Sequence, residues 1–279
     1  MDWTRAHDGL DAARFDALQS LILIAMVAHC GMLLGRADEL GWWARTVLAP
    51  AFLLSCIVGL GVREAKPWCV LASFGVASLW LALSWPSFAN HTFLEWSVLL
   101  LLVLCRGDEA LGMRALRWLP ATVLFHSGFQ KLVMGDYFQG QFLAFVTAGK
   151  PKFSDFFGLV LSDAELSRLV AMKGSIGTGP YSITEPLFLA MSNMVWIGEM
   201  AVGVLLLYKP TRRFAVWAAV ALIAGIELGA RELIFGCLFT YLVLMFYEGR
   251  RTFALWPVLG GIQILAMLAY HFLPGLRLN

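Results

Sequence analysis

The sequence predicts an all-α integral membrane protein, a polytopic helical bundle with no soluble domain. Of its 279 residues, 59% are hydrophobic and only 14% are charged. The mean hydropathy is +0.73, which is far from the composition of an ordinary soluble domain. Apolar runs of about 17 to 23 residues recur along the chain, and each is long enough to cross a hydrocarbon core roughly 30 Å thick. Composition and run length together set this fold class.

Nine apolar segments separated by helix breakers predict nine transmembrane helices, with eight as the alternative because several segments are short. The first segment follows a tail of mixed charge and lacks the cleavage site of a secretory signal, so we expect a retained helix. The fourth and seventh segments contain Glu95 and Glu227, so one of them could be re-entrant. The nine segments are 15–35, 46–62, 68–86, 92–105, 118–134, 186–208, 213–230, 232–247 and 252–273.

The distribution of lysine and arginine predicts the orientation of the bundle. Twelve of these residues lie on the side of the amino-terminal tail and eight on the opposite side, with Lys131 inside the membrane. The positive-inside rule then places the amino terminus in the cytoplasm. The long connection 135–185 lies on the non-cytoplasmic side, and Ser162 is placed to cap a short amphipathic helix within it. We therefore treat residues 1–279 as a single transmembrane domain.

Charge and cysteine spacing exclude two classes of partner. The net charge is +2, and no loop concentrates enough lysine and arginine to follow phosphates, so we expect no nucleic acid. The five cysteines lie in or at the ends of apolar runs, without the spacing of a zinc site, so we expect no metal. The expected surroundings are membrane lipid.

The fifth predicted helix carries the main candidate site. At about 100° per residue, Thr122, His126 and Gln130 form one row, and Ser127 and Lys131 form a second row beside it. A charge at mid-bilayer costs on the order of 2.5–3.5 kcal/mol, so such a residue requires a partner, a cavity or a function. Among neutral neighbours in a poorly hydrated cavity, the lysine could act as a base near neutral pH. Alternatively, its long side chain reaches the interface.

Three other polar pairs or groups lie in apolar segments. His91 and Glu95 are one turn apart and could share a proton, or form an interfacial contact. Glu199 lies near the middle of the sixth helix, as a catalytic group or as a paired structural carboxylate. Glu227 and Arg231 have the favourable order for an internal ion pair.

Three stretches resemble the horizontally transferred transmembrane family, which includes the vitamin K-dependent gamma-carboxylase. "FHSGFQKLVMGDYFQGQFL" resembles the family signature, "ANHTFLEW" its Asn-His pair, and "WIGEMAVGVLLLYKPTRRFAVW" its later helix with an internal glutamate. The resemblance covers roughly residues 90–220. The signature positions are filled by Gly128, Lys131, Leu132, Tyr137 and Gly140.

The resemblance implies a specific chemistry. In the carboxylase, the matching lysine deprotonates a reduced quinone, and the Asn-His pair holds the quinone head. By position, Lys131 would be the base, and Asn90 with His91 would contact the head group. His91 and Glu199 join Lys131 as the catalytic candidates, and the cofactor would be a quinol similar to menaquinone or vitamin K. The remaining candidates for contact with the quinol are His126, Ser127 and Gln130.

The departures from the family pattern keep a second function open. The carboxylase has a large lumenal domain after its helices, whereas this sequence stops at Asn279, and the spacing from the lysine to the second glycine is one residue longer. The alternative is a non-catalytic membrane subunit, or a maturation or immunity partner of a peptide or of a larger membrane complex. A proton relay through the intramembrane carboxylates ranks last, because no inverted repeat supports a transporter. For either main function, we expect a bacterial cytoplasmic membrane.

Overall fold

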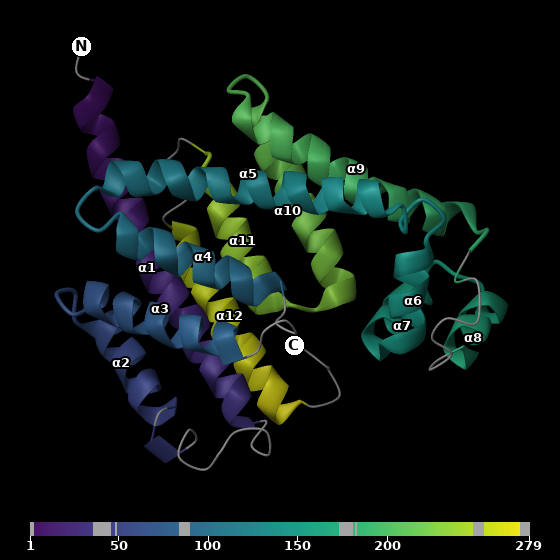
Figure 1. The fold of residues 1–279 in the computed structure, drawn as a ribbon, viewed down its shortest axis with the longest axis horizontal. Helices are drawn as coiled ribbons and strands as arrows, with labels where there is room; N and C mark the ends of the chain where they lie inside the picture. The colour runs from purple at the N-terminus through teal and green to yellow at the C-terminus, as the bar shows by residue number, and fades with distance from the viewer. Residues whose placement is uncertain are drawn as a thin grey trace. The chain divides into compact units, whose positions relative to one another are not determined.

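Helices make up nearly all of the regular structure in this protein. The computed structural model describes residues 3–35, 46–47, 49–83, 90–172, 181, 183–247 and 254–273, and only the backbone of residues 3–10, 32–35, 83, 90–91 and 271. Within these ranges there are twelve α-helices and no β-strand, which confirms the all-α class (Figure 1). The helices are α1 (Trp3–Gly35), α2 (Ala49–Gly61), α3 (Lys66–Leu83), α4 (Asn90–Leu104), α5 (Glu109–Met134), α6 (Gln141–Gly149), α7 (Pro151–Phe157), α8 (Asp163–Ala171), α9 (Pro186–Leu207), α10 (Arg212–Ala230), α11 (Leu233–Leu244) and α12 (Trp256–Phe272).

Each of the nine predicted apolar segments contains a helix, namely α1 to α5 and α9 to α12. Among the described residues, three stretches are long and apolar enough to cross a membrane: Asp11–Gly31 within α1, the whole of α9 and the whole of α10. Five further apolar helices are shorter than 18 residues. The chain is therefore compatible with a membrane protein, but nine complete spans are not confirmed.

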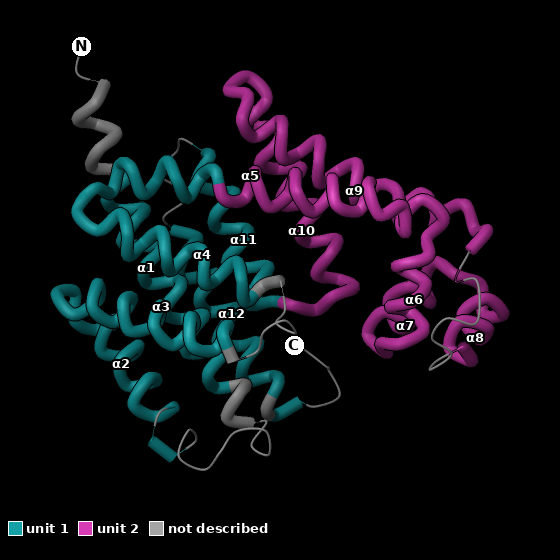
Figure 2. The backbone as a smooth tube through the Cα atoms, in the orientation of Figure 1, with its two compact units in different colours: residues 1–118, 233–279 teal, residues 119–232 magenta. Residues whose placement is uncertain are grey.

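The chain divides into two compact units (Figure 2). Unit 1 consists of residues 1–118 and 233–279, and unit 2 of residues 119–232. Helix α5 begins in unit 1 and ends in unit 2. Whether the whole chain acts as one transmembrane domain stays a prediction.

Unit 1 is organised around α1, which packs against α2, α3, α4, α11 and α12. Leu18, Leu21 and Ile22 of this helix are fully buried, as the apolar run predicts. At one end of the unit, Arg14 donates a hydrogen bond to the carbonyl oxygen of Tyr247, and Arg117 donates one to that of Met245. These two cations satisfy carbonyl groups just after α11, where a helix end leaves acceptors unpaired.

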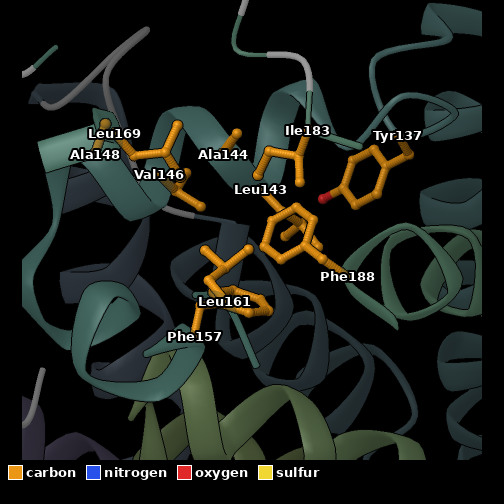
Figure 3. Packing of buried hydrophobic residues seen from close by; sticks show 10 residues of the cluster. All are labelled: Tyr137, Leu143, Ala144, Val146, Ala148, Phe157, Leu161, Leu169, Ile183 and Phe188. Carbon is orange, nitrogen blue, oxygen red and sulfur yellow. The ribbon is translucent and has the colours of Figure 1, made fainter. Parts of the chain in front are cut away.

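Unit 2 combines the long helices α9 and α10 with the short helices α6, α7 and α8. An apolar cluster formed mainly by the short helices includes Phe157, Leu169 and Phe188 (Figure 3). Lys152 of α7 donates a hydrogen bond to the carbonyl oxygen of Ala230, the last residue of α10. Burial lowers the pKa of Lys152, an effect that the nearby Glu232 partly opposes. The lysine thus joins the short helices to the end of α10.

The connection 135–185 contains more structure than the single short helix expected for it. That helix is confirmed as α8, and the hydroxyl of Ser162 accepts a hydrogen bond from the backbone N–H of Glu165 at 3.4 Å. Helices α6 and α7 were not predicted. They are 9 and 7 residues long and are separated at Lys150, with Pro151 opening α7. Proline suits the first turn of a helix, so here it begins an element rather than ending one.

Candidate functional site

Two glycines bring α5 and α9 into direct backbone contact within unit 2. A Cβ atom on Gly128 of α5 would lie 2.6 Å from the carbonyl oxygen of Trp196 and 2.9 Å from the backbone nitrogen of Met200. A Cβ atom on Gly203 of α9 would lie 2.9 Å from the carbonyl oxygen of Ala121. Small residues at such positions allow membrane helices to approach closely. The side chains next to the contact are therefore held against each other.

Lys131 of α5 and Glu199 of α9 form an ion pair beside this contact. The Lys131 Nζ lies 2.6 Å from Oε2 and 2.9 Å from Oε1 of Glu199. It also donates to the Ser127 hydroxyl, one turn earlier on α5, at 2.6 Å. The side chains of Lys131 and Glu199 are 18% and 6% exposed. The ammonium group therefore points towards α9 rather than towards solvent.

The turn after α5 closes one side of the pair. The ring of Tyr137 lies 5.5 Å from the Lys131 Nζ, within the range of a cation–π contact. The Ser192 hydroxyl of α9 donates to the Tyr137 carbonyl oxygen at 2.7 Å, which fixes this turn to α9. Burial, with the nearby charges of Glu199 and Asp136, raises the pKa of Tyr137 above its usual range. Its phenol therefore stays protonated at neutral pH.

Glycine is required at the end of the same turn. Gly140 has φ +68°, a backbone conformation that side chains with a Cβ rarely adopt. A Cβ atom there would also lie 2.9 Å from the ring of Phe188. The signature residues of the resemblance, from Gly128 to Gly140, thus occupy positions with clear structural roles.

The surroundings of Lys131 differ from the sequence-based expectation in one respect. The lysine was expected among neutral polar neighbours, but its nearest partner is the carboxylate of Glu199. An opposite charge at this distance attracts the ammonium group, and a low-dielectric site strengthens the attraction. Proton transfer between the two groups would give a neutral amine and a neutral acid, so the pair can exchange one proton without changing its net charge.

The predicted residues of α5 separate into two groups. Ser127 and Lys131 face α9 and belong to the site. His126 and Gln130, together with Thr122 of the same row, have exposed side chains. The row of Ser127 and Lys131 therefore faces α9, whereas the row of Thr122, His126 and Gln130 lies on an outer surface of α5.

Asn90 and His91 belong to unit 1, where they open α4. Their side chains lie outside the described residues, so their predicted contacts stay predictions. Glu95, one turn later, has its Oε2 atom 2.7 Å from the Nδ1 atom of His29 in α1. The described partner of Glu95 is thus a histidine that the sequence analysis did not single out, although the same rule about polar groups in apolar helices applies to it.

The predicted ion pair between Glu227 and Arg231 is wrong. Helix α10 ends at Ala230, and Arg231 has φ 54°, so its side chain leaves the helix face. It donates to Asp155 of α7 at 3.4 Å. The charged neighbours of the buried Glu227 carboxylate are Glu232 and Lys152. The change of backbone conformation at residue 231 explains the difference, because the i, i+4 rule holds only inside a helix.

Unit 1 contains a hollow between α3 and α4. It is lined by Ser78, Leu81 and Ala82 of α3 and by Trp96 of α4, and the Trp96 indole N–H donates to the Ser78 hydroxyl at 2.9 Å. Among the described residues, two helix-to-helix pairs of ionisable side chains have both members inside predicted apolar segments, namely Lys131 with Glu199 and His29 with Glu95. No family model, curated protein or solved structure matches this chain.

Proposed function

We propose that the protein is a nine-helix integral membrane enzyme of carboxylase-like type, in which Lys131 and Glu199 form an acid–base pair that acts on a lipid-soluble quinol. The observation that carries this proposal is the bonding of the Lys131 ammonium to both oxygens of Glu199. Glu199 lies near the middle of α9, one of the three helices long enough to cross a membrane. Lys131 then shares this depth, where an ionisable pair is costly and usually functional.

Glu199 gives Lys131 a route to the free amine. A lysine acts as a base only after it has lost a proton, and the Glu199 oxygens lie within hydrogen-bond distance to receive it. Transfer within the pair leaves no net charge in the apolar interior, where separate charges are expensive. The amine can then accept a proton from a weakly acidic hydroxyl, and Ser127 orients its nitrogen.

The donor set fits the hydroxyl of a quinol. An amine as acceptor, with the Ser127 hydroxyl beside it, suits a phenolic hydroxyl whose ordinary pKa is about 10, close to that of lysine. When bound, a quinol supplies two electrons and an acidic hydroxyl. Asn90 and His91 are proposed as contacts of its head group, and His126 and Gln130 as outer contacts.

Oxygen uptake in the presence of menadiol tests this function. With the full chain in lipid nanodiscs, we expect uptake above the protein-free rate. Lys131→Met should reduce the protein-dependent part about 100-fold or more, since a general base contributes roughly 10² to 10⁴. Lys209→Met, in the exposed turn after α9, is the matched control and should keep the rate. Uptake that is unchanged in Lys131→Met would contradict the proposal.

One observation favours the alternative, a non-catalytic membrane subunit or a maturation or immunity partner of a peptide or larger complex. The Lys131 ammonium has three donors, and Ser127 and the two Glu199 oxygens accept three hydrogen bonds from it. A saturated pair of this kind is also what a purely structural link between two helices requires. Copurification with another protein at fixed stoichiometry, and no menadiol-dependent uptake, would support the alternative.

A further inference from the structure

The second intramembrane pair, in unit 1, is deeply buried on its carboxylate side. Glu95 has a side chain that is 4% exposed, and its Oε2 atom accepts the hydrogen bond from the Nδ1 atom of His29 at 2.7 Å. The neighbouring residues Leu94, Val98 and Leu99 of α4 are buried apolar side chains. A carboxylate in such surroundings normally has a hydrogen bond to each oxygen.

Glu95 does not meet this expectation. Its Oε1 atom is buried and has no hydrogen-bond partner among the residues that the structure describes. Leaving a buried acceptor unpaired is unfavourable, and more so when it carries charge. The unpaired oxygen therefore points to a donor that the described residues do not supply.

The surroundings restrict what this donor can be. The oxygen needs an N–H or O–H group, and the apolar neighbours favour a ligand that carries this group on an apolar body. His29 already binds the other oxygen of Glu95, so a neutral donor is sufficient to complete the hydrogen bonds of the carboxyl group. A hydroxyl on an apolar ring has all three properties.

We propose that the His29–Glu95 pair is a second ligand site, in which the Glu95 Oε1 atom accepts a hydrogen bond from the hydroxyl of an apolar phenol. The choice of a phenol over other apolar hydroxyl compounds rests on the proposed quinol function. Residue 91 lies one turn before Glu95 on the same face of α4, so the α4 segment proposed to contact the quinol head leads directly to this pair. Within the pair, His29 is a positioning residue for the carboxylate.

Histidine NMR with matched probes tests this site. The full chain, labelled with ¹⁵N-histidine in phosphatidylcholine nanodiscs, has five histidines, and the His29 signals are those lost in His29→Gln. Titration with 1-naphthol should shift them saturably, because the ligand shares the carboxylate with His29. The methyl ether 1-methoxynaphthalene has the same ring without the hydroxyl and should not shift them.

The Glu95→Gln variant tests the role of the Oε1 atom while it keeps the hydrogen bond to His29. Its amide oxygen can still accept from His29, but the amide NH₂ then occupies the place of Oε1 and is a donor. We expect the affinity for 1-naphthol to fall at least about tenfold, the usual effect of losing a hydrogen bond to a charged group. Unchanged affinity would overturn the proposal, as would equal shifts with naphthol and its ether, or no shift with either, since a bound water would then account for the oxygen.

Two further variants complete the test. The double variant His29→Leu/Glu95→Leu removes both polar groups, and its thermal midpoint should equal or exceed that of the wild type. Unfolding of this variant would show that the pair is structural and would overturn the proposal. Lys209→Met should leave the naphthol affinity unchanged. If Lys131→Met loses the oxygen uptake but the wild type does not bind naphthol, this second site alone is refuted. If the wild type binds naphthol but its oxygen uptake does not depend on Lys131, the proposed function alone is refuted.

Discussion

The stability of unit 2 depends on how the charge of one ammonium group, that of Lys131, is balanced. Among the described acidic residues, Glu199 alone forms a salt bridge with Lys131 and balances its charge. Removing one member of such a pair leaves an uncompensated charge, which costs about 3–5 kcal/mol in buried pairs. Removing both leaves none.

We therefore expect Lys131→Met and Glu199→Met to lower the thermal midpoint strongly when made singly, and the double variant to recover most of the loss. Thermal unfolding of the detergent-solubilised protein, followed by circular dichroism, measures all three. Single variants as stable as the wild type would mean that the pair contributes little in the membrane, and additive losses in the double variant would mean that the two residues are not coupled.

At the scale of single residues, the ionisable groups were easier to predict from the sequence than their partners. Lys131, Glu199 and Glu95 were recognised because each lies in an apolar segment. The partner of Glu95 was sought four residues away, where helical spacing is visible in the sequence, but the described partner is His29, 66 positions away. Such contacts depend on which helices pack together, and a single sequence does not contain that information.

Helix packing at Gly128 controls the distance between α5 and α9. A Cβ there would meet two backbone atoms of α9, which cannot rotate away as a side chain can, and the Cγ atom of Met200. Gly225 of α10 is a matched position, because a Cβ there would have no heavy atom within 4 Å. The two glycines therefore differ in the free space around them, although both lie within helices.

Gly128→Ala should destabilise the protein by about 1–3 kcal/mol, the usual cost of overpacking. Gly225→Ala should be neutral or stabilising by up to about 1 kcal/mol, because alanine favours helix. Thermal midpoints in the same detergent compare the two. Equal effects would mean that α5 and α9 do not approach as closely as the structure places them. Menadiol-dependent oxygen uptake should fall in Gly128→Ala as well, since the Lys131 Nζ would move away from Glu199.

The elements themselves were predictable to different degrees. Long apolar runs give nine helices close to the expected positions, because burial of an apolar segment in helical form satisfies every backbone group. Helices α6 and α7 were missed because they are short and their boundaries contain proline and glycine, which usually indicate loops. Their stability comes from the shared apolar cluster around Phe157 and Phe188, a tertiary effect.

At the scale of the whole molecule, the lengths of the helices bear on the number of membrane spans. Helix α11 has 12 residues, which corresponds to roughly 18 Å at 1.5 Å per residue and is shorter than a hydrocarbon core. Spanning by such helices requires local thinning of the bilayer or polar residues that reach the interface. This length is the physical reason that helix positions alone do not establish nine crossings.

Reporter fusions can count the crossings. With the amino terminus in the cytoplasm and nine spans, a fusion after Asn279 should lie outside the cytoplasm, and one at Lys209, between α9 and α10, inside it. Alkaline phosphatase activity and green fluorescence report the two sides. A cytoplasmic carboxyl end would contradict nine spans and agree with eight. A reporter within the connection 135–185 should lie outside with nine spans, or with eight if the seventh segment is re-entrant, and inside if the fourth segment is re-entrant, so it identifies which segment does not cross.

The order of the two units along the chain has a consequence for biosynthesis. Unit 2 is one continuous segment, residues 119–232, whereas unit 1 needs residues 233–279 to complete it. During translation, α1 must wait for α11 and α12, its packing partners, while α5 and α9 can already associate. Domains generally fold as the ribosome releases them, so the contact between Lys131 and Glu199 can form before α1 packs against α11 and α12. A chaperone that shields nascent membrane helices would therefore bind α1 for longer than any other helix.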